Sequence, residues 1–323
     1  FQRQFLERMR VFFFSRWMTA SVSPQRPRSV VVMCQKRRNN LYFRAMIFNR
    51  LFWVCVCLVG AVAGRAQVEI PPVEVEPDWY ITWGYNRSMY TTSTVHIWGT
   101  GPTGQAFDVT LHNVTAKDMP ERFQAKVYFH PGLFTIPQFN ARFGKRIREH
   151  WIASAGWDHM KYKLEKQWME VDGYAAAADF MDEAPESAEL SSAGDSLYWG
   201  HGFNFEHSDG LNFVRFSLEH EHVLWAPQGR EFSLRMFEAA GAGIVVCSTD
   251  FRWAGDRYKN PQHISGLGMS LHAGFRANVH RRFFIQTSAQ FGSMTLPWIR
   301  VQGPTDAGAT QRFGFAEAAF ALG

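Results

Sequence analysis

The chain has 323 residues and a formal net charge of +5, but the charge is unevenly distributed. Residues 1–45 hold ten of the 34 Lys and Arg and one of the 29 acidic residues, a net charge of +9, and the remaining 24 basic and 28 acidic residues give −4. Because the excess lies in an N-terminal stretch without periodic patterning, the composition disfavours nucleic-acid binding. Three of the four cysteines precede residue 67, which excludes a disulfide framework and a cysteine-based zinc site from the main body.

The N-terminal part of the chain has the pattern of an export signal. From Met46, M-I-F-N-R forms a short basic region, residues 51–63 are apolar, and G-R-A at 64–66 resembles a cleavage site. The apolar region is shorter than the roughly 20 residues that a membrane-spanning helix needs, so the pattern favours a signal peptide over an anchor. We expect residues 1–45 to be a basic leader outside the mature protein, 46–66 a secretory signal peptide, and 67–78 a Pro- and Glu-rich linker.

Residues 79–323 are predicted to form a closed antiparallel transmembrane β-barrel. Residues 211–225 alternate, with Phe216 and Leu218 apolar and Arg215 and Glu219 polar, and residues 266–279 repeat the pattern. A continuous apolar face opposite small and polar residues is typical of barrels in lipid, where every backbone polar group must be paired. Strands of about ten residues predict roughly 10–12 crossings. A periplasmic lipocalin-like barrel or a β-sandwich also alternates and is the alternative fold.

Turn and loop signals divide this segment. Asp209-Gly210 predicts a two-residue hairpin between residues 203–207 and 211–225. Residues 179–196 contain six acids and no base, which predicts a solvated loop. Residues 252–262 and 297–308 are rich in Gly, Pro and charge, and are also predicted to be loops.

The alternation assigns side chains to two faces. Trp157 is predicted to lie at the membrane interface. His159, Lys161 and Lys163 are predicted to extend past it toward lipid headgroups or lipopolysaccharide phosphates. The alternative is that these residues form an ordinary solvated rim. The side chains predicted to face the lumen are Asp158, Arg215, Glu219, Glu221, His272, Arg276 and Asn278.

Several segments carry a family resemblance. They are W-G-Y-N-R-S (83–88), A-K-D (116–118), I-P-Q-F-N-A-R-F-G (136–144), G-W-D-H-M-K-Y (156–162) and F-E-H-S-D-G-L-N (205–212). They resemble uncharacterised outer-membrane β-barrel proteins of Bacteroidota-type bacteria, and the final F-A-E-A-A-F-A-L-G resembles the terminal strand that such proteins use for assembly. The resemblance implies an outer-membrane location and the barrel-assembly machinery as a partner. It implies no activity, so no catalytic residue is carried over.

Two groups of residues could carry chemistry. His220 and His222 have the i, i+2 spacing that can chelate zinc or copper, but no third ligand follows from spacing, so no metal site is predicted. His207, Ser208 and Glu219 are similar in type to the catalytic residues of outer-membrane lipid A deacylases. In that family the His and Ser are two residues apart and share a face, whereas His207 and Ser208 are adjacent and diverge. A lipid A acyl hydrolase is therefore only the alternative function.

The residues favour a non-enzymatic outer-membrane barrel with a structural, adhesive or small-solute binding or transport role. We expect no cofactor and no metal. The expected partners are outer-membrane lipid, lipopolysaccharide and the barrel-assembly machinery, and not nucleic acid. A ring of 10–12 strands has a narrow lumen, which excludes a wide diffusion pore.

Overall fold

A computed structural model describes residues 78–323, apart from 121–123, 129, 131, 134–136, 177–188, 191–195, 199–201, 229 and 304. The predicted leader, the signal peptide and the linker up to residue 77 lie outside the described residues, as does most of the predicted acidic loop. No helix in the described ranges has the length and the apolar character needed to cross a membrane.

The described elements are strands, apart from one short helix, α3 (Ala125–Tyr128). The strands are β1 (Trp79–Tyr90), β2 (Ser93–Thr100), β3 (Ala106–Val114), β4 (Ala116–Lys117), β5 (Phe139–Arg148), β6 (Trp151–Leu164), β7 (Trp168–Ala176), β8 (Glu189–Leu190), β9 (Ser196–Tyr198), β10 (Asn204–Trp225), β11 (Ser233–Cys247), β12 (Asp250–Trp253), β13 (Asp256–Lys259), β14 (His263–His280), β15 (Phe283–Arg300) and β16 (Gly308–Leu322). The predicted all-β class is therefore confirmed.

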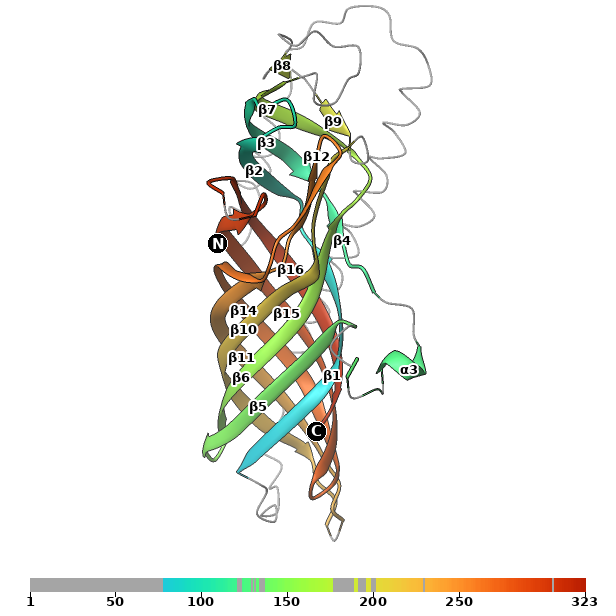
Figure 1. Cartoon of the computed structure of the whole chain (residues 1–323). Helices are drawn as coiled ribbons and strands as arrows, with labels where there is room; N and C mark the ends of the chain where they lie inside the picture. Colours follow the sequence, from blue (N-terminus) through green and yellow to red (C-terminus); the bar gives the residue numbers. More distant parts are fainter. Residues whose placement is uncertain are drawn as a thin grey trace, which may run out of the picture. The chain divides into compact units, whose positions relative to one another are not determined.

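Eight strands form a closed antiparallel ring (Figure 1). Their order is β1-β5-β6-β10-β11-β14-β15-β16, and β16 pairs back to β1, with Trp83 opposite Leu322 and Tyr90 opposite Phe315. The predicted 10–12 crossings are corrected to eight for this ring. The strands are longer than the assumed ten residues, reaching 22 in β10, and several strands lie outside the ring.

The sheet continues beyond one end of the ring (Figure 1). The first residues of β16, Gly308–Arg312, pair with β2 instead of β1, and β3 and β7 follow β2 in the sheet. A hairpin of β12 and β13 pairs with the start of β10 and occupies part of the predicted loop 252–262. We call β2, β3, β7, β12 and β13 the extension. At the opposite end, β5 and β6 are joined by residues 149–150, and β14 and β15 by residues 281–282.

The Asp209-Gly210 pair does not reverse the chain, which corrects the predicted hairpin. β10 runs through it without interruption, and both sides pair with β6: His207 lies opposite Tyr162, and Leu211 lies opposite Met160. Three residues of β10 therefore oppose one residue of β6, which is a β-bulge. Gly210 has φ of +149°, a backbone conformation that favours glycine.

Apolar and polar residues are segregated along the molecule. In the extension and the adjoining ends of β6, β10, β11, β15 and β16, side chains form one apolar core, in which the rings of Phe107 and Trp253 stack at 3.8 Å. Further from the extension, the buried side chains inside the ring are largely polar or charged, including Arg142, Glu219 and Arg276. The candidate site is this polar and charged part of the ring interior.

Candidate functional site: the charged interior of the ring

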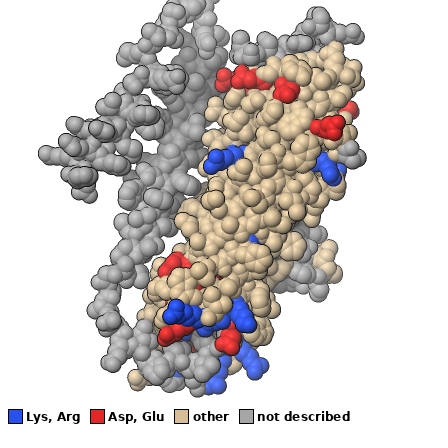
Figure 2. All heavy atoms as spheres, turned by 90° about the vertical axis from the view of Figure 1, so that its left-hand side faces the viewer, with Lys and Arg blue, Asp and Glu red and all other residues tan. Residues whose placement is uncertain are grey.

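The ring strands have an apolar outer face and a polar inner face. On β10, Phe216 is 75% exposed while the neighbouring Arg215 is fully buried, and on β14 Leu271 is 67% exposed while His272 is buried. Successive side chains of a strand point to opposite faces, so the alternation places the charges inside. Other exposed apolar residues of the ring strands are Ile81, Phe143, Trp157, Leu218, Leu267, Met269, Phe275, Ile285 and Phe320. Figure 2 shows a broad band with almost no charged side chains on one side of the molecule.

The first part of the interior is a fully buried ion pair between β6 and β10. Arg215 Nη1 lies 2.8 Å from Asp158 Oδ2, and neither side chain is exposed. Asn140 donates a hydrogen bond to Asp158, and Arg215 donates one to Gln290 on β15. These contacts connect β5, β6, β10 and β15, so the pair lies in the lumen between strands that are not all neighbours.

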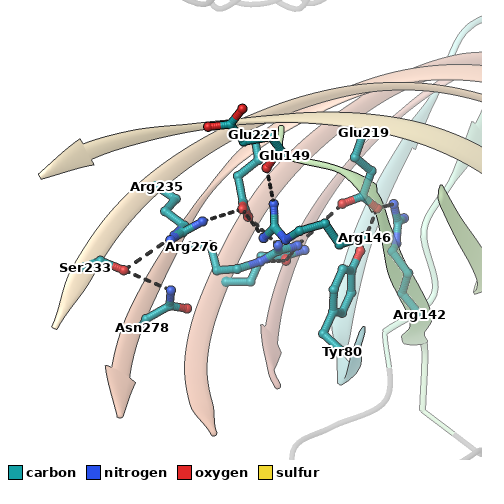
Figure 3. Close-up of polar contacts among 11 residues, drawn as sticks. Tyr80, Arg142, Arg146, Glu149, Glu219, Glu221, Ser233, Arg235, Arg276 and Asn278 are labelled. Atoms are coloured by element: carbon teal, nitrogen blue, oxygen red, sulfur yellow. Dashed lines mark hydrogen bonds and ion pairs between the residues drawn. The ribbon is translucent and has the colours of Figure 1, made fainter. Parts of the chain in front are cut away.

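The second part is centred on Glu219. The Tyr80 hydroxyl donates a 2.6 Å hydrogen bond to Glu219 Oε1, and Arg142 Nη1 lies 3.4 Å from the same oxygen (Figure 3). Arg276 Nη2 lies 3.5 Å from the other carboxylate oxygen. Arg142 also donates to Nε2 of His272. Glu219 therefore links β10 to β1, β5 and β14 across the ring.

The third part is centred on Glu221, two residues along the same strand. Arg276 Nη1, Arg235 Nη1 and Arg146 Nη2 lie 2.6, 2.7 and 3.0 Å from its carboxylate oxygens (Figure 3). The Arg276 guanidinium lies 4.3 Å from the ring centroid of Tyr80, a cation–π contact. The Glu221 carboxylate is therefore paired with cations, which is the condition under which a buried charge is tolerated.

Asn278, which is also predicted to face the lumen, lies at the margin of this network. Asn278 donates a 2.9 Å hydrogen bond to the hydroxyl of Ser233, on the neighbouring strand β11 (Figure 3). Ser233 also accepts a hydrogen bond from Arg235. Asn278 thus belongs to the same cluster of contacts as Glu221, through Arg235.

The residues predicted to contact lipid headgroups have different surroundings. Trp157 is 44% exposed on the outer face. His159 is buried, with its ring stacked on Phe139 and its Nδ1 2.8 Å from the side-chain oxygen of Asn212. The indole N–H of Trp157 donates to that same oxygen at 2.9 Å. His159 therefore packs along the wall of the ring.

The two lysines of this group have different surroundings from each other. Lys161 is buried, with 6% of its surface exposed. Lys163 Nζ lies 2.9 Å from Glu206 Oε2, an ion pair between β6 and β10. The structure thus buries His159 and Lys161, whereas Lys163 is partly exposed.

The residues of the hydrolase alternative are not brought together. His207 Nδ1 lies 3.0 Å from the Thr249 hydroxyl, and the Ser208 hydroxyl donates to Glu206 at 3.1 Å. Glu219 belongs to the interior network, twelve residues further along the same strand, which is roughly 40 Å in extended backbone. A serine nucleophile needs its base within hydrogen-bond reach, so these contacts do not support a Ser–His–Glu triad.

Much of the interior network was not predicted from the sequence. Tyr80, Arg142, Arg146 and Arg235 all contribute to it and were not assigned a role. A signal was present: residues 140–147 alternate, with Asn140, Arg142 and Arg146 on one face and Phe143 on the other. Applying the alternation to this segment would have placed both arginines inside.

Comparisons with known proteins find no matching family model and no matching curated protein. Among solved structures, Neisserial surface protein A (NspA) has 10% sequence identity and a TM-score of 0.26, covering 76% of this chain and 98% of that chain. The attachment invasion locus protein Ail of Yersinia pestis has 12% identity and a TM-score of 0.26, with 76% and 99% covered. The outer membrane protein AlkL has 10% identity and a TM-score of 0.28, with 80% and 95% covered. These values are too low to assign a family or a function.

Proposed function

We propose that the ring is a β-barrel that spans the outer membrane, and that the protein has a structural or adhesive role there. The observation that carries this proposal is the inverted polarity of the ring. Large apolar side chains cover its outside while ion pairs occupy its inside. A domain in water has the opposite arrangement, whereas a barrel in lipid needs this one.

The two ends of the ring support an orientation. Short connections, residues 149–150, 226–232 and 281–282, join the strands at one end, and the extension lies at the other (Figure 1). Outer-membrane barrels commonly have short periplasmic turns and longer extracellular segments. The extension carries partly exposed polar pairs on adjacent strands, His96 with Asp108 and His112 with Asp172, each 2.7 Å apart. A polar face of this kind fits an aqueous location, so we assign the extension to the cell surface as the part available for adhesion.

The interior network argues against transport of solutes through the ring. Glu219 and Glu221 hold side chains from β1, β5, β11 and β14 inside an eight-stranded ring. A ring of eight strands has an interior just wide enough for side chains to fill. These contacts therefore occupy the path that a solute would take.

Membrane insertion tests the location. The Leu271→Arg variant is expected to lose about 2–4 kcal/mol of folding free energy in lipid vesicles, because arginine on the lipid face near the bilayer centre is costly. Ala106→Arg, at an exposed position at the start of β3 in the extension, is the matched control and should fold like the wild type. The folded fraction is measured by heat-modifiable mobility on gels. Equal folding of the two variants would place the outer face in water and favour the soluble-barrel alternative.

Conductance tests the role. The wild-type protein in planar bilayers is expected to show no stepwise conductance, because the ion pairs fill the ring. The double variant Glu221→Ala/Arg276→Ala removes one acid and one base together, and it should introduce a measurable leak. Discrete conductance steps from the wild type would contradict the filled interior and support a small-solute transport role.

A further inference from the structure

His220, His222 and Glu238 form a compact cluster on the outer face of the ring, separate from the interior network. His220 Nδ1 lies 3.0 Å and His222 Nε2 lies 2.8 Å from the same oxygen, Oε1 of Glu238. The two imidazole centroids are 4.4 Å apart. One potential ligand atom from each residue lies within 4.8 Å of the other two.

The strand pairing holds these three residues together. His220 and His222 are two residues apart on β10, so they share a face, and Glu238 lies directly opposite His220 on β11. Both strands belong to the closed ring, so the backbone of the cluster is fixed before any ligand binds. Preorganisation of this kind reduces the free energy that ordering the ligands would cost.

The cluster is open to water at the end of the ring that has the short turns. His220 pairs with Trp151, the first residue after the β5–β6 turn, and His222 lies beyond the last paired residue of β6. The side chains of His220, His222 and Glu238 are 28%, 43% and 46% exposed. A dissolved ion therefore has access to all three.

We propose that His220, His222 and Glu238 bind a divalent transition-metal ion of the zinc type. Two imidazoles and one carboxylate suit Zn²⁺ better than Ca²⁺ or Mg²⁺, which prefer oxygen ligands. Zinc–ligand distances of about 2.0–2.1 Å place tetrahedral ligand atoms roughly 3.3 Å apart, close to the spacing within the cluster. The ion replaces the two imidazole–carboxylate contacts, and water completes its coordination.

Zinc titration of the purified full-length protein in detergent, with any affinity tag removed, tests this site. Calorimetry should show saturable Zn²⁺ binding that is weakened about tenfold or more in the His222→Ala and Glu238→Gln variants, since even outer-shell changes cost 10–100-fold. X-ray absorption should show nitrogen or oxygen ligands at about 2.0–2.1 Å from the zinc. Each variant is first checked for wild-type heat-modifiable mobility, and exposed substitutions of this kind rarely disturb folding.

The matched control is His280→Ala. His280 is an exposed histidine at the same end of the ring, and its Nε2 lies 3.2 Å from Glu231, but among the described residues this pair is not part of a three-ligand cluster. Zinc binding by His280→Ala should equal that of the wild type. The proposal would be overturned if Glu238→Gln bound zinc as tightly as the wild type. It would also be overturned if His280→Ala lost as much zinc affinity as the cluster variants.

Discussion

Replacing Arg215 with methionine is expected to destabilise the ring by about 3–5 kcal/mol, because the substitution leaves the Asp158 carboxylate buried without its cation. The Asp158 and Arg215 side chains have no exposed surface, so water does not reach the carboxylate to replace the lost partner. Urea unfolding in lipid vesicles, followed by tryptophan fluorescence, measures the change.

The double variant Asp158→Asn/Arg215→Met is the control for this prediction. It removes both charges while keeping similar side-chain volumes, and the introduced amide oxygen would still accept a hydrogen bond from Asn140. Replacing a whole buried ion pair by neutral groups is often nearly neutral or stabilising, so most of the lost stability should return. If the single and double variants are destabilised equally, the loss comes from side-chain packing at this position. The uncompensated Asp158 charge would then not be its cause.

Replacing Gly84 with alanine is expected to weaken closure of the ring by about 1–3 kcal/mol, the cost of forcing an extra group into a packed site. Gly84 lies on β1 and pairs with Ala321 on β16, where the ring closes. A Cβ atom at position 84 would overlap the backbone oxygen of Phe320 and the backbone of Ala321. Backbone atoms cannot move aside as a flexible side chain can, so β1 and β16 must separate. The midpoint of urea unfolding and the folded band on unheated gels report the loss.

Gly156→Ala is the matched control for Gly84→Ala. Gly156 also lies on a ring strand, but the nearest atoms to an added Cβ belong to the Arg142 side chain at 3.5 Å, which is an ordinary van der Waals contact distance. The substitution should be neutral, or stabilising by up to about 1 kcal/mol through reduced freedom of the unfolded chain. If the two variants unfold at the same urea concentration, the closing pair of strands is no more tightly packed than the rest of the ring.

The sequence alone predicted that this is an all-β chain and which residue types share a face. Along β10, Phe216 and Arg215 must point in opposite directions in any extended backbone, whatever strand lies beside them. The same reasoning applies to Leu271 and His272 on β14. This information is local, because it depends only on a period of two, and so it can be read without knowing the fold.

The tertiary structure decided which strands are neighbours and which charges meet. Arg276 contacts Glu221 across 55 residues of sequence, and Glu238 meets His220 because of the register of β11 against β10. A period of two is unchanged when a strand slides by two residues, so alternation cannot specify such partners. The number of ring strands, and the use of Asp209-Gly210 as a bulge, likewise depend on pairing with a distant strand. Long-range pairing therefore determined the ring, its interior network and the His220–His222–Glu238 cluster. Local alternation determined only which side chains lie on the face where each of these contacts forms.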